Sequence, residues 1–157
     1  MVVVNHLRRL CNAEQVSLAL CEGRKQAKVR AISDVEKIDL NSEANKLVLT
    51  ACKQTILADQ TIFYPAAEGE HTPAILALDK YCKSNSMEAC VGLPLKTEDG
   101  RTIGSLLIGA TQEQLADPNY QQYLNRLVSL STGHLDVVLR ANRGLTDFAK
   151  ELSLIHI

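Results

Sequence analysis

Residues 89–111, ACVGLPLKTEDGRTIGSLLIGAT, decide the fold because they predict a long antiparallel β-hairpin. Apolar residues alternate along both expected strands and are expected to share one face of each: Val91, Leu93 and Leu95 on the first, and Ile103 and Leu107 on the second. The polar turn between them contains Asp99 and Gly100, a pair that supplies the positive φ of a tight hairpin turn. A hairpin identifies no function, so the remaining segments have to narrow the choice.

Length and composition predict one soluble domain. The chain has 157 residues, which is an ordinary size for a single domain. A formal charge of −1 and an aromatic content of 4% argue against nucleic acid as a partner, since such proteins present basic surfaces and stacking rings. No apolar run approaches the roughly 20 residues of a membrane span, and the first residues do not resemble a signal peptide. We therefore expect no membrane contact by this segment itself.

The cysteines indicate a reducing compartment. Their number is odd, and their spacing fits neither a zinc site nor a disulfide framework: Cys11, Cys21, Cys52, Cys82 and Cys90. Several of them lie among apolar residues, where a free cysteine usually serves as a small core residue. The histidines also lack the spacing of metal ligands, so the sequence predicts no metal and no resident cofactor.

Other segments add three helices and three strands to the hairpin. A helix is expected over 5–13, a second hairpin closed at Gly23 over 16–31, and a helix over 41–59 with Ser42 or Asn41 as its N-cap. A short strand over 61–64 ends at Pro65. Thr72 and Pro73 then open a helix that runs to about residue 85, because proline favours the first helical position.

The last predicted helix opens at Asp117 and Pro118 and ends at Gly144. An apolar stripe runs along it at steps of four and three residues: Tyr120, Leu124, Leu127, Ser131, His134 and Val138. The whole order predicts an α+β domain over 5–143, with an antiparallel sheet of five to six strands, helices packed on its faces, and the N- and C-terminal helices together. Residues 144–157 are expected to form a linker or an appended tail.

These segments resemble a GAF domain, a profilin-like fold. The resemblance covers roughly residues 5–142 and rests on VSLALCEGRKQAKVRAIS, TIFYP, the long hairpin and the closing helix. Its most specific part is Val91, Gly92, Pro94 and Leu95 followed by an Asp-Gly turn and Ile-Gly. VSLAL, VRAIS, TIFYP and HLDVVLRANRGL further resemble the GAF-type region of HlyD-like secretion or membrane-fusion proteins. That resemblance implies a cytoplasmic part of a larger protein, attached to a membrane-fusion or other output domain.

A GAF resemblance implies a small-molecule pocket between the sheet and the helix over 71–86. Candidate pocket residues share that region of the chain: Tyr64, His71, Ile75, Lys80 and Cys90. The known ligand signatures are incomplete here. Asn45-Lys46 lacks the Phe and Asp-Glu partners of the members that bind cyclic nucleotides, and Cys82 is followed by Lys83 instead of the His found in bilin-binding members. The ligand, if one binds, is therefore unidentified.

Catalysis ranks last among the hypotheses, because no serine elbow, phosphate loop or paired-carboxylate motif is present. A redox enzyme or thiol sensor would need Cys82 and Cys90 to meet beside Lys80 or Lys83, which would lower a thiol pKa. The leading hypothesis is a non-catalytic regulatory module that homodimerises through its terminal helices, and the alternative is a ligand sensor. Candidate dimer-interface residues lie on the two terminal stripes: Leu7, Leu10, Tyr120, Leu124, Leu127 and His134.

Overall fold

The computed structural model describes the backbone of residues 2–21, 27–67 and 70–155, and the side chains of residues 3–21, 27–67 and 70–141. The predicted turn at Gly23 lies outside these ranges. The elements follow in the order α1 (Val2–Leu10), β1 (Gln15–Cys21), β2 (Ala27–Ile32), α2 (Glu43–Ala58), β3 (Ile62–Tyr64), α3 (Pro73–Ser84), β4 (Ala89–Lys96), β5 (Thr102–Ala110), α4 (Gln112–Ala116) and α5 (Pro118–Ile155).

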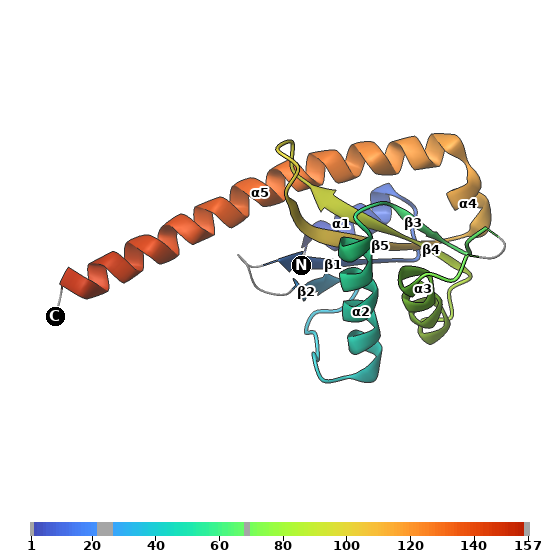
Figure 1. Cartoon of the computed structure of the whole chain (residues 1–157), viewed down its shortest axis with the longest axis horizontal. Helices are drawn as coiled ribbons and strands as arrows, with labels where there is room; N and C mark the ends of the chain where they lie inside the picture. Colours follow the sequence, from blue (N-terminus) through green and yellow to red (C-terminus); the bar gives the residue numbers. More distant parts are fainter. Residues whose placement is uncertain (1, 22–26, 68–69, 156–157) are drawn as a thin grey trace.

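One antiparallel sheet organises the chain, with its five described strands in the order β2-β1-β5-β4-β3 (Figure 1). The predicted α+β fold with an antiparallel sheet is confirmed. The predicted long hairpin forms β4 and β5, which pair from Ala89 opposite Ala110 to Lys96 opposite Thr102. Gly100 in its turn has a φ of 84°, a conformation that glycine adopts without steric cost.

The hairpin corrects one prediction. Ile103 packs on the face that carries Leu106 and Ile108, whereas Leu107 packs on the opposite face. The register shifts between Leu95, which pairs with Gly104, and the next residue of β4. This bulge inserts one extra residue into β5, so the alternation beyond it changes phase. Ile103 and Leu107 therefore do not share a face.

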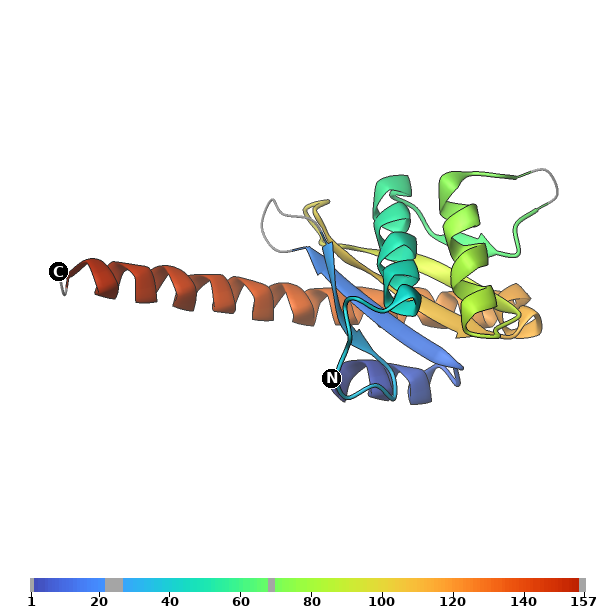
Figure 2. The same cartoon turned by 90° about the horizontal axis from the view of Figure 1, so that it is seen from below.

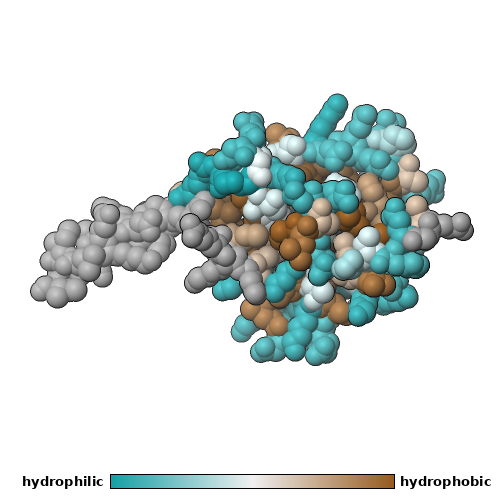
Figure 3. Space-filling model, in the orientation of Figure 1, coloured by the Kyte–Doolittle hydropathy of each residue, from teal (hydrophilic) through white to brown (hydrophobic). Residues whose placement is uncertain are grey.

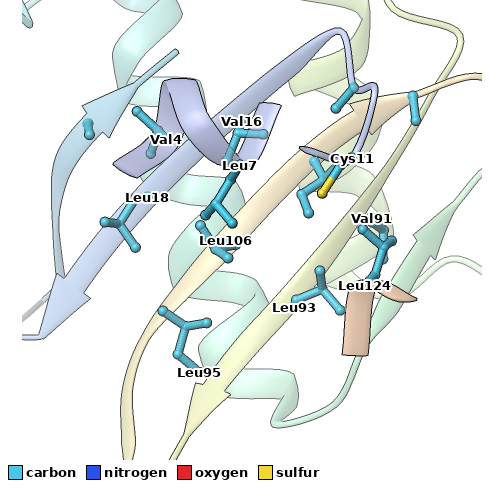
Figure 4. Close-up of a cluster of buried hydrophobic side chains, with 14 of the residues drawn as sticks. Val4, Leu7, Cys11, Val16, Leu18, Val91, Leu93, Leu95, Leu106 and Leu124 are labelled. Atoms are coloured by element: carbon cyan, nitrogen blue, oxygen red, sulfur yellow. The ribbon is translucent and has the colours of Figure 1, made fainter. Parts of the chain in front are cut away.

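Two helical layers cover the sheet. Helices α2 and α3 lie on one face, and α1 and α5 lie on the other (Figure 2). Figure 4 shows side chains from α1, α5 and three strands meeting beneath the second layer. Ser42 and Thr72 cap α2 and α3 by accepting hydrogen bonds from backbone N–H groups three residues ahead, as predicted.

Helix α5 is longer than the sequence predicted. It continues through Gly144 to Ile155, and its second half extends beyond the sheet (Figures 1 and 2). A glycine inside a helix costs only about 1 kcal/mol relative to alanine, and the following residues DFAKELSLI are mostly good helix formers. The prediction that Gly144 ends this helix is therefore wrong.

The described surface has a mixed character. In the view of Figure 3, apolar surface forms separate patches between polar side chains. Within the described ranges, no helix combines the length and the hydrophobicity that crossing a lipid bilayer requires.

Candidate functional site on helix α5 and a second candidate beside β3

Helix α5 carries two apolar faces. The inner face packs on the sheet through Leu124, which is 1% exposed, together with Thr132 and Leu135. On the outer side, Leu130 is 73% exposed and Val137 is 67% exposed. An apolar side chain in water loses the roughly 1.5–3 kcal/mol that burial would provide. The outer side of α5 is therefore a candidate contact surface.

Exposed and half-buried residues on this side follow one regular spacing. We call them the outer stripe: Tyr123, Leu127, Leu130, His134, Val137 and Ala141. The steps alternate between four and three residues, which is the pattern that brings two helices together in a coiled coil. The stripe lies wholly within the described side chains, and all its members are apolar or aromatic except His134, which is titratable.

The structure separates the predicted interface residues into two groups. Leu7 and Leu124 are buried against the sheet, so they belong to the intramolecular core and have no surface to offer a second chain. That part of the predicted seam is corrected: a stripe counted from Tyr120 follows the inner face for its first turns. Leu10 and His134 are exposed, and Leu127 is half-buried.

Tyr120 has a structural contact instead. Its hydroxyl donates a hydrogen bond of 2.7 Å to the carbonyl oxygen of Cys11, which joins the start of α5 to the segment after α1. Sequence reasoning missed Leu130 and Val137 as surface residues. The signal is present in the sequence, because the same four–three spacing also begins at Tyr123, but spacing alone does not distinguish that stripe from the one that begins at Tyr120.

A cluster of charged side chains contacts α5 just after Leu135, a buried residue of this helix. Asp136 accepts a hydrogen bond of 3.4 Å from Arg101 of the β4–β5 turn and lies 3.2 Å from the Nε of Arg140. Arg101 also donates to Asp99 at 2.9 Å. Hydrogen bonds from Thr97 and Arg101 lower the pKa of Asp99 to about 2. The hairpin turn therefore contacts the helix at the point where the helix leaves the sheet.

A second candidate site is an open pocket of about 770 Å³ beside β3. Its walls come from the end of α2, from β3 and from the start of α3: Gln54, Leu57, Ala58, Gln60, Thr61, Ile62, Phe63, Pro65, Ala66, Ala67, Glu70, Thr72, Pro73, Ala74 and Ile75. This volume falls within the range of small-molecule sites. Glu70 supplies the charge among these lining residues, which include no lysine, arginine or histidine. The lining suits a neutral or cationic molecule better than an anion.

Only one of the predicted pocket residues lines this pocket, namely Ile75. Tyr64 donates a hydrogen bond to Asp79 of α3, and this bond raises the pKa of Tyr64 to about 12. His71 and Lys80 are exposed outside the pocket, and Cys90 is fully buried under α3. The pocket lies nearer the end of α2 than predicted, beside the three-residue strand β3.

The layer between α2, α3 and the sheet is closely packed. Tyr81 is fully buried, with its hydroxyl 3.4 Å from that of Ser17. Ser105 donates a hydrogen bond of 3.1 Å to the carbonyl oxygen of Cys52 in α2. Thr55 of α2 lies so close to Gly92 of β4 that a side chain at Gly92 would overlap it. Side chains of the protein itself therefore fill this region.

The cysteines are in a poor environment for redox chemistry. Cys82 and Cys90 do meet, as the thiol-sensor hypothesis required, but both are buried. A hydrogen bond that the Cys90 thiol donates to Cys82, together with burial, raises the pKa of Cys90 well above its usual value, which disfavours the nucleophilic thiolate. Lys83 pairs with Asp79 at 3.0 Å. Within the part of the chain that is described, no cluster of three His, Cys, Asp or Glu residues could hold a metal ion.

No model of a known protein family matches this sequence, and no curated protein sequence matches it. The structure, however, is similar to solved GAF domains. The GAF domain of a two-component sensor histidine kinase from Bacillus halodurans superposes with a TM-score of 0.57 at 14% identity, over 87% of this chain and 95% of that one. The third GAF domain of Slr1393 from Synechocystis sp. PCC6803, in its photoproduct state, gives 0.58 at 10% identity, over 94% of each chain.

A domain from Sinorhizobium meliloti 1021, described as part of a two-component sensor histidine kinase, gives a TM-score of 0.60 at 14% identity, over 92% of each chain. These values establish that the chain has the GAF fold. At such low identity they establish the fold alone, so the function has to be argued from the residues of this chain.

Proposed function

We propose that this chain is a non-catalytic GAF-type regulatory module that acts by homodimerisation through α5. The outer stripe carries the proposal, because Leu130 and Val137 are exposed on a helix whose opposite face is already buried. A second copy presents the same stripe, so two chains can bury both at once. The GAF fold and the closely packed α2/α3 layer support a role in regulation and assembly.

The wider setting of this module is also a proposal. We infer that it forms the cytoplasmic part of a larger HlyD-like secretion protein, and that α5 connects it to the rest of that protein. The support is the sequence resemblance together with the length of α5. Cysteine labelling of the full-length protein in intact cells tests this location: a residue of the outer stripe that is labelled from outside the inner membrane would contradict it.

Sedimentation velocity of wild-type protein and of two aspartate variants tests the dimer. Leu130→Asp removes two buried leucines per dimer, so we expect the dimer Kd to rise at least about 100-fold. Leu76→Asp is the matched control, because Leu76 is exposed on α3, away from the outer stripe and outside the lining of the pocket beside β3. We expect Leu76→Asp to dimerise like wild type. A wild-type protein that stays monomeric at high micromolar concentration would overturn the proposal.

A second candidate function is small-molecule sensing, which the 770 Å³ pocket beside β3 favours. Its lining suggests a neutral or cationic molecule with an apolar part. Native mass spectrometry of freshly purified protein tests this. The expected result is an added mass that disappears on denaturation and that Thr61→Trp, a bulky substitution in the pocket wall, reduces. An unchanged mass in both proteins would count against this function and leave the dimer proposal standing.

A further inference from the structure

His134 lies in the middle of the outer stripe, where a second helix would cover it. It is exposed in the single chain, with Leu130 and Val137 one turn away on either side. No hydrogen bond or ion pair joins His134 to another of the described residues. The nearest charged side chains along α5 are Asp136 and Arg140, and Asp136 is already engaged by Arg140 and by Arg101 of the hairpin. Among the described side chains, no carboxylate therefore compensates a charge on His134.

The stripe can pair with its copy in two orientations. In a parallel pair each residue of the outer stripe faces the same residue of the partner helix. His134 then faces the partner's His134, and Val137 faces the partner's Val137. In an antiparallel pair centred on the stripe, the sequence spacing places His134 opposite the partner's Leu130. The two orientations thus give the imidazole different neighbours.

The flanking charges favour the parallel orientation. Arg126 immediately precedes Leu127, and Arg140 immediately precedes Ala141. Both arginines therefore border the same side of the outer stripe. An antiparallel pair would bring Arg126 beside the partner's Arg140 at both ends, which is repulsive. A parallel pair places Arg126 beside the partner's Ser131, which is uncharged. Avoidance of the arginine–arginine contact therefore favours the arrangement in which the two histidines meet.

We propose that the α5 dimer is parallel and that the facing His134 side chains make its assembly depend on pH. This inference rests on the proposed dimerisation and adds its orientation and its control. Two neutral imidazoles fit side by side in the seam. Two imidazolium ions in the same layer repel each other and lose water, with no carboxylate of the described residues to compensate them. The dimer therefore assembles at neutral pH and dissociates on acidification.

The direction and size of the effect follow from proton linkage. Two imidazolium ions in one layer oppose pairing, so the dimer takes up protons less readily than two single chains do; it is fully stable above the ordinary titration range of histidine, about pH 6.5, and weakens below it. If one imidazole per dimer must stay neutral, the Kd rises about sixfold between about pH 8 and pH 5.5; if both must, it rises about 100-fold.

Sedimentation velocity at about pH 8 and pH 5.5 tests this with wild type, His134→Leu and the control His71→Leu. His71 is an exposed histidine outside α5, so its loss should leave the pH dependence unchanged. We expect a rise of at least about fivefold in the Kd of wild type and of His71→Leu on acidification, and a rise under about twofold for His134→Leu.

A cysteine variant tests the orientation. In the parallel pair, Val137→Cys places two thiols in one layer, and mild oxidation should give a disulfide-linked dimer that wild type, whose cysteines are mostly buried, does not form. In an antiparallel pair the two introduced thiols would lie in different layers, too far apart to form a disulfide. Absence of the linked product from a dimeric Val137→Cys sample would therefore overturn the proposed orientation.

Each outcome separates this inference from the proposed function. A dimer whose Kd is the same at both pH values, or whose pH dependence survives in His134→Leu, overturns the role of His134 but leaves the dimer in place. A wild-type protein that is monomeric at both pH values overturns the dimer and this inference with it. Dissociation on acidification that His134→Leu abolishes supports both.

Discussion

The helical layers on the two faces of the sheet differ in their packing and in the apolar side chains that they expose. On the α2/α3 face, a buried tyrosine, two buried serines and the close approach of Thr55 to Gly92 leave little room. On the α1/α5 face, α5 buries Leu124 and Leu135 but leaves Leu130 and Val137 in water. The close packing of side chains on the α2/α3 face stabilises the folded chain. Leu57 on α2 and Leu76 on α3 are exposed as well, but singly, whereas the exposed apolar residues of α5 recur at the spacing of a coiled coil.

The largest expected contrast lies within α5 itself. Leu124→Ala should lower the free energy of unfolding by about 2–5 kcal/mol, because it leaves a cavity beneath the helix. Leu130→Ala should change it by less than about 0.5 kcal/mol when the protein is monomeric. Urea denaturation at a concentration below the dimer Kd measures both. Equal losses would show that the two sides of α5 do not differ as described.

The closed face can be tested at its tightest contact. Gly92→Ala should destabilise the protein by about 1–3 kcal/mol, because the added methyl group overlaps Thr55. In a Thr55→Ala background the same substitution should cost much less, since the obstructing side chain is gone. A double-mutant cycle by chemical denaturation measures this coupling. An equal cost in both backgrounds would mean that the layer is more loosely packed than the structure shows.

The smallest effect is expected where α5 leaves the sheet. Asp136→Asn removes the carboxylate that Arg101 and Arg140 share, and an ion pair this close to the surface contributes less than about 1 kcal/mol. Hydrogen exchange should nevertheless become faster in α5 beyond residue 136. Glu43→Gln, which removes the Lys46 partner on α2, is the control and should leave exchange in α5 unchanged. Unchanged exchange in Asp136→Asn would mean that the hairpin contact does not restrain the helix.

Local chemistry made much of the fold predictable. The Asp-Gly turn, the Ser42 and Thr72 caps and Pro73 at the first helical position each act within a few residues, so the sequence pattern identifies them. Long-range packing was harder to predict. The bulge at Ile103 depends on pairing with β4, and a stripe on α5 does not reveal whether the sheet or a second chain will cover it.

The candidate sites show the same limit. Of the predicted pocket residues, Ile75 lines the cavity, whereas Tyr64 and Cys90 are taken up by contacts with α3. Which side chains face a cavity depends on the length of β3 and the position of the α2 end, and these are tertiary properties. The spacing of Leu130 and Val137 is visible in the sequence. Only the burial of Leu124 against the sheet shows that these two residues lie on the solvent side of α5.

The length of α5 has a mechanical consequence. Beyond Leu139, the last of the described side chains that packs against the core, the helix continues to Ile155, an overhang of about 24 Å at 1.5 Å per residue. The overhang is a lever with its pivot near Asp136. A tilt of about 5° at the pivot moves the Ile155 end of the helix by about 2 Å, on the scale of the helix shifts that separate the two states of many allosteric proteins. A small change in the folded domain is thus enlarged at the far end of the helix.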